Sequence, residues 1–267
     1  MALVRCDFES EVLEVATSMT VLMPQDEQSG APAANPRPDP PVLYLLHGLS
    51  DDSTSWLRHT SLERYLWERP LVVVMPQVGR SFYADEVHGH RYWTFLTEEL
   101  PAIVSGFFRT STRPADTYVA GLSMGGYGAL KWALRQPERF AGAASLSGAL
   151  DLTNLMGLPE RQELSQRVYD GRVGPQDDLF ALLEHSDVST LPPLFVGCGT
   201  EDPLFEGNRR FAAAATAAGL DLRVDFRPGE HEWGFWDASL PDLLAWLPRA
   251  PDPTAFSGTL VIGSDPS

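Results

Sequence analysis

The sequence has few cysteines, few basic residues and no long hydrophobic run. Its 267 residues include two cysteines, Cys6 and Cys198, which lie too far apart to suggest a disulfide framework or a metal-binding spacing. Twenty Lys and Arg residues stand against 36 Asp and Glu residues, which gives a formal net charge of −16. That charge repels phosphate backbones and anionic lipids, so nucleic acid and membrane surfaces are poor candidate partners.

No apolar run approaches the ~20 residues that a transmembrane helix needs. The first ten residues, Met1–Ser10, also lack the basic region and apolar core of a signal peptide. Together with two free thiols, these absences predict a cytoplasmic protein. Hydrophobic residues make up 43% of the chain, which is enough for the buried core of a globular domain.

Strand-like segments alternate with helix-like segments along most of the chain. Eight segments have the apolar or alternating pattern of strands: Leu3–Ser10, Glu14–Met23, Val42–Leu46, Leu71–Met75, Thr117–Gly121, Ala143–Leu146, Leu194–Val196 and Leu222–Phe226. Helical patterns lie near Leu62–Glu68, Glu98–Phe108, Met124–Gln136, Phe205–Ala218 and Ala238–Leu247. This order predicts an α/β fold with a doubly wound, mostly parallel sheet and helices on both faces.

We predict a single domain over residues 1–250 and a C-terminal tail over residues 251–267. The proline-rich stretch Pro24–Pro41 is interpreted as a surface loop, because the segment before it is too short to fold alone. A second irregular stretch, 151–191, separates two strands and is broken by glycines and prolines. It is either an insertion that covers a substrate or an ordinary long crossover, and the pattern leaves both open.

The segment Gly121-Leu-Ser-Met-Gly125 joins a predicted strand to a predicted helix. A serine between two such glycines is typical of a nucleophile elbow, a tight turn that raises the hydroxyl above the sheet at a helix N-terminus. A chance glycine-serine turn is the alternative, but the strand and helix on either side make chance less probable. Ser123 is therefore the candidate nucleophile.

A nucleophilic serine needs a histidine base, and on elbows of this kind the chain order is serine, acid, histidine. Only His185 and His231 follow Ser123. His185 lies in the irregular stretch, whereas His231 lies in a glycine-containing loop between the last strand and the last helix. We therefore favour His231 as the base.

The acid is expected at the end of the strand that precedes the histidine loop. Asp202 ends the segment Gly199-Thr-Glu-Asp202 there and is favoured, with Glu201 as the main rival. A turn or helix-capping role is the structural alternative for Asp202. Two backbone N–H groups are expected to hold the oxyanion, one from Met124 and one from Leu49 in the loop after the strand Val42–Leu46.

With these residues assembled, the chain resembles the esterase D branch of the α/β hydrolases. The likeness is strongest to bacterial tributyrin-type carboxylesterases and weaker to S-formylglutathione hydrolases. It rests on four motifs: Leu46-His-Gly-Leu-Ser with Ser55-Trp56, Gly121-Leu-Ser-Met-Gly-Gly126, Gly199-Thr-Glu-Asp202, and Gly229-Glu-His-Glu-Trp233 with Trp236.

The resemblance implies an α/β-hydrolase fold and hydrolysis of short acyl esters with no cofactor and no metal. In the roles it implies, Ser123 is the nucleophile, His231 the base and Asp202 the acid that orients it. Many relatives are dimers or tetramers, so a homo-oligomer is a further expectation. Two carboxylates, Asp51 and Asp52, depart from the Ser-Gly-Asn sequence common in tributyrin-type relatives.

Aromatic residues in the predicted loops suggest an acyl pocket. We expect Trp56, Trp93 and Trp233 near Ser123, although a core position is the ordinary role of any single tryptophan. The leading prediction is a serine carboxylesterase for acetyl to butyryl esters. The alternatives are an S-formylglutathione hydrolase-like thioesterase, disfavoured by the absence of a cysteine from Leu49-Ser-Asp51, and a non-catalytic binding protein of the same fold.

Overall fold

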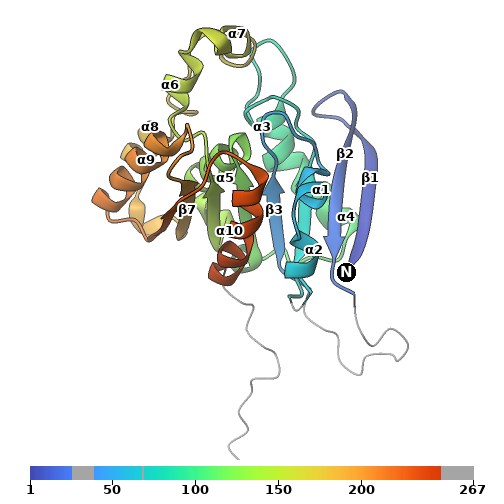
Figure 1. Ribbon diagram of the computed structural model, residues 1–267. Helices are drawn as coiled ribbons and strands as arrows, with labels where there is room; N and C mark the ends of the chain where they lie inside the picture. The colour runs from blue at the N-terminus through green and yellow to red at the C-terminus, as the bar shows by residue number, and fades with distance from the viewer. Residues whose placement is uncertain (26–38, 68, 248–267) are drawn as a thin grey trace, which may run out of the picture.

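The computed structural model describes residues 1–25, 39–67 and 69–247 (Figure 1). The predicted tail over residues 251–267 and most of the predicted loop Pro24–Pro41 lie outside the described residues. Within the described part, eight strands form one sheet in the order β1-β2-β4-β3-β5-β6-β7-β8. The strands are β1 (Ala2–Ser10), β2 (Val15–Met23), β3 (Val42–Leu46), β4 (Val72–Pro76), β5 (Thr117–Leu122), β6 (Gly142–Leu146), β7 (Leu194–Gly199) and β8 (Leu222–Arg227).

The sheet is parallel from β4 to β8 and antiparallel where β1 and β2 join it. Continuous apolar runs form the central strands because helices bury both of their faces. The edge strands β1 and β8 alternate apolar and polar residues and remain partly exposed. The predicted α/β fold with a mostly parallel sheet is therefore confirmed, and each predicted strand has a counterpart.

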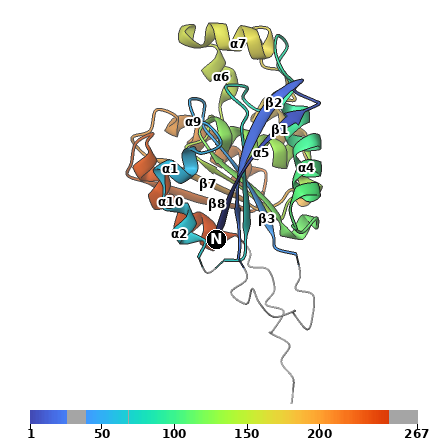
Figure 2. The ribbon, with the colours of Figure 1, turned by 90° about the vertical axis from the view of Figure 1, so that its right-hand side faces the viewer.

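Helices cover both faces of the sheet and enclose two apolar cores. One face carries α1 (Ser55–His59), α2 (Leu62–Tyr65) and α10 (Trp233–Trp246), and Figure 2 shows these opposite α4. The other face carries α3 (Tyr92–Thr94), the π-helix η1 (Phe95–Glu99), α4 (Leu100–Phe107), α5 (Met124–Arg135), α8 (Leu179–His185) and α9 (Phe205–Ala217). Among the described helices, none is long and apolar enough to cross a membrane.

The irregular stretch between β6 and β7 forms α6 (Leu152–Met156), α7 (Gln162–Tyr169) and α8. Helices α6 and α7 project beyond the strand ends at the top of Figure 1. The backbone amides of Val87 and His88 donate to the carbonyls of Val168 and Arg167, and Arg167 pairs with the buried carboxylate of Glu86. These contacts fasten α7 to the loop after β4.

The described residues also form four short 3-10 turns: η2 (Pro114–Asp116), η3 (Pro137–Arg139), η4 (Pro159–Arg161) and η5 (Val188–Thr190).

Some helices differ from the sequence prediction. Helices α1 and α3 have no predicted counterpart, because their five and three residues are too few to show a helical period. Helix α10 begins at Trp233, well before the predicted start at Ala238. Gly234 and Pro241 weaken its helical pattern, but burial of Phe235 and Leu240 against the sheet stabilises the helix.

Candidate active site

Ser123 lies at a sharp turn between β5 and α5, with φ 53° and ψ −117°. This backbone conformation is strained for a residue with a side chain, and the neighbouring glycines make it possible. A Cβ atom on Gly121 would lie 2.4 Å from the backbone of Gly125, and one on Gly125 would lie 2.3 Å from the carbonyl oxygen of Leu46. The turn is fixed to β6 by the Ser123 N–H, which donates to the Leu146 carbonyl at 2.9 Å.

The structure brings Ser123, His231 and Asp202 together from three separate loops. Nε2 of His231 lies 3.1 Å from Oγ of Ser123, and Nδ1 of His231 lies 2.8 Å from Oδ2 of Asp202. Asp202 follows β7, and His231 lies between β8 and α10. In this arrangement the Nδ1–H donates to the carboxylate, which leaves Nε2 free to accept the serine proton.

Asp202 is buried and remains a carboxylate. Burial acts to raise its pKa, but hydrogen bonds from His231 and from the Leu204 amide outweigh burial, so the pKa lies below its ordinary value. The Leu204 N–H donates to Oδ1 at 2.7 Å, on the oxygen that His231 does not use. The carboxylate is therefore held in one orientation from both sides. Burial and the charge of Asp202 raise the pKa of the neighbouring Cys198 to about 12, so this cysteine is a thiol.

The hydrogen-bonded series Ser123, His231 and Asp202 is called the relay below. The rival candidates, His185 and Glu201, lie away from this relay or support it. His185 ends α8, is exposed, and contacts the Ala181 carbonyl through Nδ1 at 2.7 Å. Glu201 is exposed, and its Oε2 accepts the Gly229 N–H at 2.6 Å. Because the Glu201 N–H also donates to the Gly229 carbonyl at 3.0 Å, Glu201 braces the loop that carries His231 without bonding to the imidazole.

The loop after β3 packs against the start of α5. The Gly48 carbonyl accepts from Nδ1 of His47 at 2.7 Å and from the Asp51 N–H at 3.3 Å. The Gly48 carbonyl and the Leu49 N–H belong to the same trans peptide and point in opposite directions. The Leu49 N–H therefore points away from Nδ1 of His47 and from the Asp51 N–H. Among the described residues, neither the Leu49 nor the Met124 amide donates to any acceptor. Both expected oxyanion donors are therefore unpaired.

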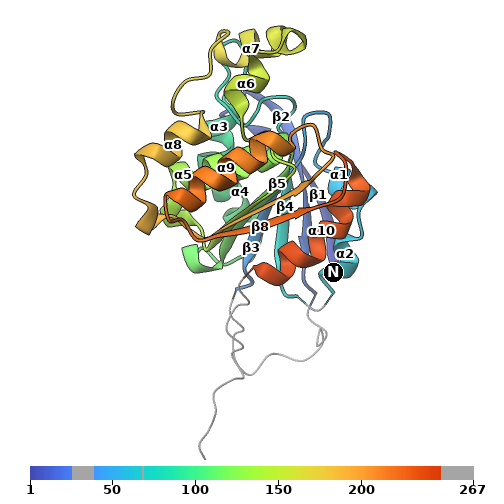
Figure 3. The same ribbon diagram turned by 60° about the vertical axis from the view of Figure 1, so that its left-hand side comes forward.

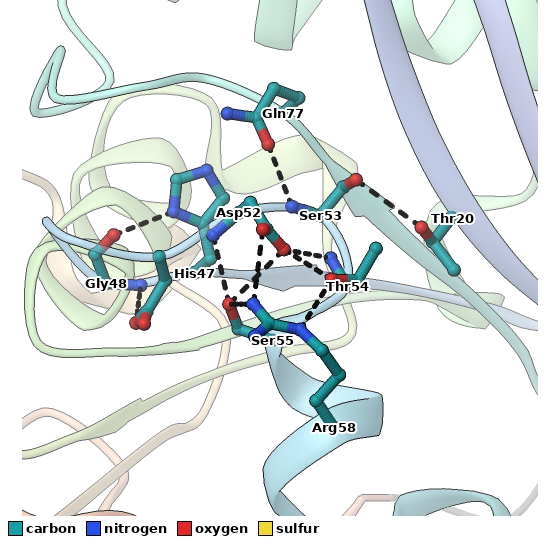
Figure 4. A network of polar contacts seen from close by, with 10 residues as sticks. Thr20, His47, Gly48, Asp52, Ser53, Thr54, Ser55, Arg58 and Gln77 are labelled. Atoms are coloured by element: carbon teal, nitrogen blue, oxygen red, sulfur yellow. Dashed lines mark hydrogen bonds and ion pairs between the residues drawn. The ribbon is translucent and has the colours of Figure 1, made fainter.

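His47 is buried and links two loops. Its Nε2 accepts the Val78 N–H at 3.2 Å, so its proton is on Nδ1, which donates to Gly48. Burial lowers the pKa of His47, although the bond to Gly48 and the nearby charges of Asp51 and Asp52 oppose that shift. His47 is thus a neutral structural histidine that fixes the peptide after Gly48. Figure 4 shows this contact together with the polar network on the same loop.

Asp52 organises the rest of that network (Figure 4). Its Oδ1 accepts from the amide and the hydroxyl of Thr54 at 2.7 and 2.6 Å, and its Oδ2 pairs with Arg58 at 3.1 Å. Burial acts to raise the pKa of Asp52, but these hydrogen bonds outweigh it and hold the pKa at about 2. The Asp52 carboxylate is therefore used within the loop, and its partners fix the start of α1.

The tryptophans divide into two groups. Trp233 contacts both Trp56 and Trp236 edge to face, at centroid distances of 5.6 and 5.1 Å, and Trp236 contacts the His231 ring at 4.9 Å. These three rings form an aromatic cluster beside the imidazole. Trp93 lies elsewhere, against the cationic side chains of α5, and no contact with the Ser123 relay is present in the described part of the chain.

One buried ion pair was not anticipated from the sequence. Lys131 of α5 is fully buried, and its Nζ lies 2.5 Å from Oδ1 of Asp177 and 3.0 Å from the Tyr83 carbonyl. It also lies 4.7 Å from the centre of the Trp93 ring. The pair joins the helix that follows Ser123 to the segment between β6 and β7 and to the loop after β4. A lysine within the otherwise apolar run Ala129–Leu134 was the only signal in the sequence.

The arrangement can carry acyl transfer through a serine. A cavity of about 330 Å³ lies beside β2, but its lining residues, which include Leu13, Gln77 and Tyr92, do not include the relay. In residues 1–25, 39–67 and 69–247, no three His, Cys, Asp or Glu side chains gather so as to hold a metal ion. The reactive groups that the structure brings together at this site are the Ser123 hydroxyl, the His231 imidazole and the unpaired amides of Leu49 and Met124.

Comparison with known proteins agrees with this chemistry. The acetyl esterase of Caldicellulosiruptor saccharolyticus is 26% identical over 94% of this chain and 100% of the relative. The diacylglycerol acyltransferase/mycolyltransferase Ag85A of Mycobacterium leprae is 35% identical over 79% of this chain and 77% of the relative. Among solved structures, S-formylglutathione hydrolase (FrmB) from Staphylococcus aureus superposes with a TM-score of 0.82 at 31% identity, covering 92% and 98% of the two chains.

The family model named Esterase, described as "Putative esterase", matches residues 10–247. This match spans most of the sequence and includes every strand from β2 to β8. The chain belongs to the Esterase family and is a carboxylic ester hydrolase.

Proposed function

We propose that this chain hydrolyses short-chain acyl esters, from acetyl to butyryl, through an acyl-enzyme on Ser123. The observation that carries the proposal is the continuous relay from Oγ of Ser123 through His231 to Asp202, with distances of 3.1 and 2.8 Å. A serine hydroxyl is a weak nucleophile until a positioned base removes its proton, and the relay supplies that base.

In acylation, Oγ of Ser123 attacks the ester carbonyl carbon while Nε2 of His231 takes the hydroxyl proton. The N–H groups of Leu49 and Met124 stabilise the resulting oxyanion. When the tetrahedral intermediate collapses, the bond to the alcohol oxygen breaks, and His231 returns its proton to that oxygen. The alcohol leaves, and the acyl group stays on Ser123.

In deacylation, His231 takes a proton from water, and the hydroxide oxygen attacks the acyl carbon. The second intermediate expels Oγ of Ser123, which recovers the proton from His231, and the carboxylic acid leaves. Throughout both halves the Asp202 carboxylate stabilises the transient imidazolium. Its pKa, held below the ordinary value by its hydrogen bonds, keeps it charged at neutral pH.

Two observations support a short acyl group. The aromatic cluster of Trp56, Trp233 and Trp236 contacts the His231 ring through Trp236, so bulky side chains lie beside the base. The relative that matches over its whole length is named an acetyl esterase. The likeness to S-formylglutathione hydrolase from Staphylococcus aureus makes thioester hydrolysis the second candidate, because the same relay and oxyanion donors serve both reactions.

The test compares hydrolysis of p-nitrophenyl esters from acetate to decanoate with hydrolysis of S-formylglutathione. We expect kcat/KM to be highest for the esters of two to four carbons, and we expect Ser123→Ala to lose activity by about 10⁴-fold or more. Ser105→Ala, on the exposed side of α4, is the matched control and retains full activity. A higher kcat/KM for the thioester would favour the second candidate, and full activity of Ser123→Ala would refute the proposed nucleophile.

A further inference from the structure

Strand β8 ends the sheet and leaves one edge open. Figure 3 shows it at the near edge between α9 and α10, and β7 is its single neighbour in the strand order. Val224, at the middle of the strand, is 43% exposed. An edge strand with an exposed apolar centre can pair with another chain unless its charges prevent it. The charges of β8 therefore decide what this edge can bind.

The backbone directions of β8 follow from its bonds to β7. Carbonyls of Asp221 and Arg227 accept from Leu194 and Thr200 at 2.8 and 3.0 Å, so the odd-numbered residues face β7. Backbone groups alternate along a strand, and the even-numbered residues Leu222, Val224 and Phe226 therefore direct their N–H and C=O groups outward. Within the described residues, no group bonds to these three from the open side.

The sequence of this edge is complementary to itself when it is read in the opposite direction. The segment Asp221-Leu-Arg-Val-Asp-Phe-Arg227 has Val224 at its centre. In an antiparallel pair of two copies with Val224 opposite Val224, each Arg223 stands opposite Asp225, and each Asp221 stands opposite Arg227. Leu222 stands opposite Phe226. Every charged position thus faces its opposite charge, and every apolar position faces an apolar one.

We propose that this chain forms a two-fold symmetric dimer in which two β8 strands pair antiparallel about Val224, joining two sheets into one. The outward N–H and C=O groups of Leu222, Val224 and Phe226 then bond to Phe226, Val224 and Leu222 of the second copy. An interface around a two-fold axis uses the same patch on both copies, which is what a self-complementary segment provides. This inference does not depend on the proposed catalytic roles.

The charges also select this register over its neighbours. Because outward-facing residues must stand opposite each other, the two nearest alternative registers place the axis at Arg223 or at Asp225. An axis at Arg223 places the two Arg223 side chains opposite each other and Asp221 opposite Asp225. An axis at Asp225 places Asp225 opposite itself and Arg223 opposite Arg227. Both shifts set like charges together, which is destabilising.

Side chains on both faces of β8 are already held in position for this pairing. Arg227 bonds to Asp242 of α10 at 2.9 Å and lies 3.6 Å from Asp225, so these two charged side chains of β8 are ordered on the α10 face. On the other face the Phe226 ring packs against Phe205 of α9 at 5.2 Å. Pre-ordered side chains lose less conformational entropy when a second copy binds.

The other edge strand, β1, provides a matched control. It carries a similar Arg-x-Asp pattern in Arg5 and Asp7, which already pair with each other at 3.3 Å. Pairing of two β1 strands about Cys6 would set Leu3 opposite Glu9, so the self-complementarity there is incomplete. A charge reversal on β1 should therefore leave the association unchanged.

The test measures molar mass by sedimentation equilibrium at about 0.15 M salt, where the Debye length is about 8 Å and the repulsion between two chains of charge −16 is screened. We expect the full-length wild type and Arg5→Asp to be dimers. We expect Arg223→Asp to weaken dimerisation by about 100-fold or more, because the introduced carboxylate then stands opposite Asp225 twice across the axis. The double variant Arg223→Asp/Asp225→Arg exchanges the charges and restores the dimer.

Ester hydrolysis and circular dichroism check that each variant folds, because none of these residues lies at the candidate active site. A monomeric wild type would overturn the proposal. It would also be overturned if Arg223→Asp remained dimeric, if the exchanged variant failed to recover while it folded normally, or if Arg5→Asp dissociated as well.

Discussion

The imidazole of His47 fixes the peptide bond that follows Gly48. Nδ1 of His47 lies 2.7 Å from the Gly48 carbonyl oxygen, and Nε2 accepts the Val78 N–H at 3.2 Å. The carbonyl is held toward the histidine, and so the Leu49 N–H on the same peptide points the other way. One buried, neutral histidine outside the group Ser123, His231 and Asp202 thus sets the direction of a proposed oxyanion donor.

Removal of the His47 imidazole should lower kcat more than it raises KM. In His47→Leu the peptide after Gly48 loses its donor, and misplacement of an oxyanion N–H can cost about 10²-fold in rate. His47→Asn keeps a donor near the position of Nδ1 and should recover part of kcat. Steady-state kinetics on p-nitrophenyl acetate measures both variants. Equal kcat for His47→Leu and the wild type would contradict this role.

The free energy of unfolding should decrease as the pH is lowered, partly because of His47. Burial holds the pKa of His47 below 6.5 in the folded chain, so as the pH drops below that value the unfolded chain binds the proton more readily. The neutral, buried His47 therefore contributes its full share to the free energy of unfolding above pH 6.5. That share is lost as the pH falls from 6.5 toward the lower pKa that His47 has in the folded chain. Urea unfolding between pH 7 and pH 5 should show a weaker pH dependence in His47→Asn. An unchanged slope would argue against a buried neutral imidazole.

Asp202→Asn should reduce kcat by about 10⁴-fold, the loss typical of this kind of relay, because an amide does not stabilise the imidazolium. The matched control is Glu201→Gln, one residue earlier, whose side chain bonds to Gly229 and not to His231. That control should lose little in kcat. If the two variants showed the reverse order of effects, Glu201 would be the acid and the assignment from geometry would be wrong.

Most of the fold could be predicted from local patterns. Strands β3 to β7 are mostly apolar, and short apolar strands between helical segments leave few alternatives to a parallel sheet. The start of α10 at Trp233 could not be predicted, because Gly234 and Pro241 disfavour a helix locally. Tertiary burial of its apolar face decides that helix, and a local pattern does not report tertiary burial.

Gly125→Ala should disrupt the elbow, whereas the same change at Gly106 should not. A Cβ atom on Gly125 would lie 2.3 Å from the Leu46 carbonyl and 2.8 Å from the His47 carbonyl, both of them backbone atoms. We expect a loss of about 1–3 kcal/mol in unfolding free energy and a large loss of kcat. At Gly106, in α4, nothing lies within 4 Å, and Ala should stabilise the helix by about 0.5–1 kcal/mol. Thermal unfolding distinguishes the two, and a stable, active Gly125→Ala would contradict the packing described.

The reacting residues of the candidate site could be predicted from the sequence more readily than the residues that hold them in place. Ser123, Asp202 and His231 stand out because glycine-rich loops follow predicted strands, and the structure brings these three within hydrogen-bond distance. The supporting roles of His47 and Lys131 depend on contacts between segments far apart in the chain. Nothing in the local sequence indicates that Val78 or Asp177 lies beside them.

The most direct test of the account is to locate the residue that reacts with a fluorophosphonate. The reagent should label the wild type once, and peptide mass mapping should place the adduct on Ser123. Labelling should vanish in Ser123→Ala and slow by orders of magnitude in His231→Ala, because the serine then lacks its base. An adduct on any other residue, or equal labelling of Ser123→Ala, would contradict the proposed nucleophile and the mechanism built on it.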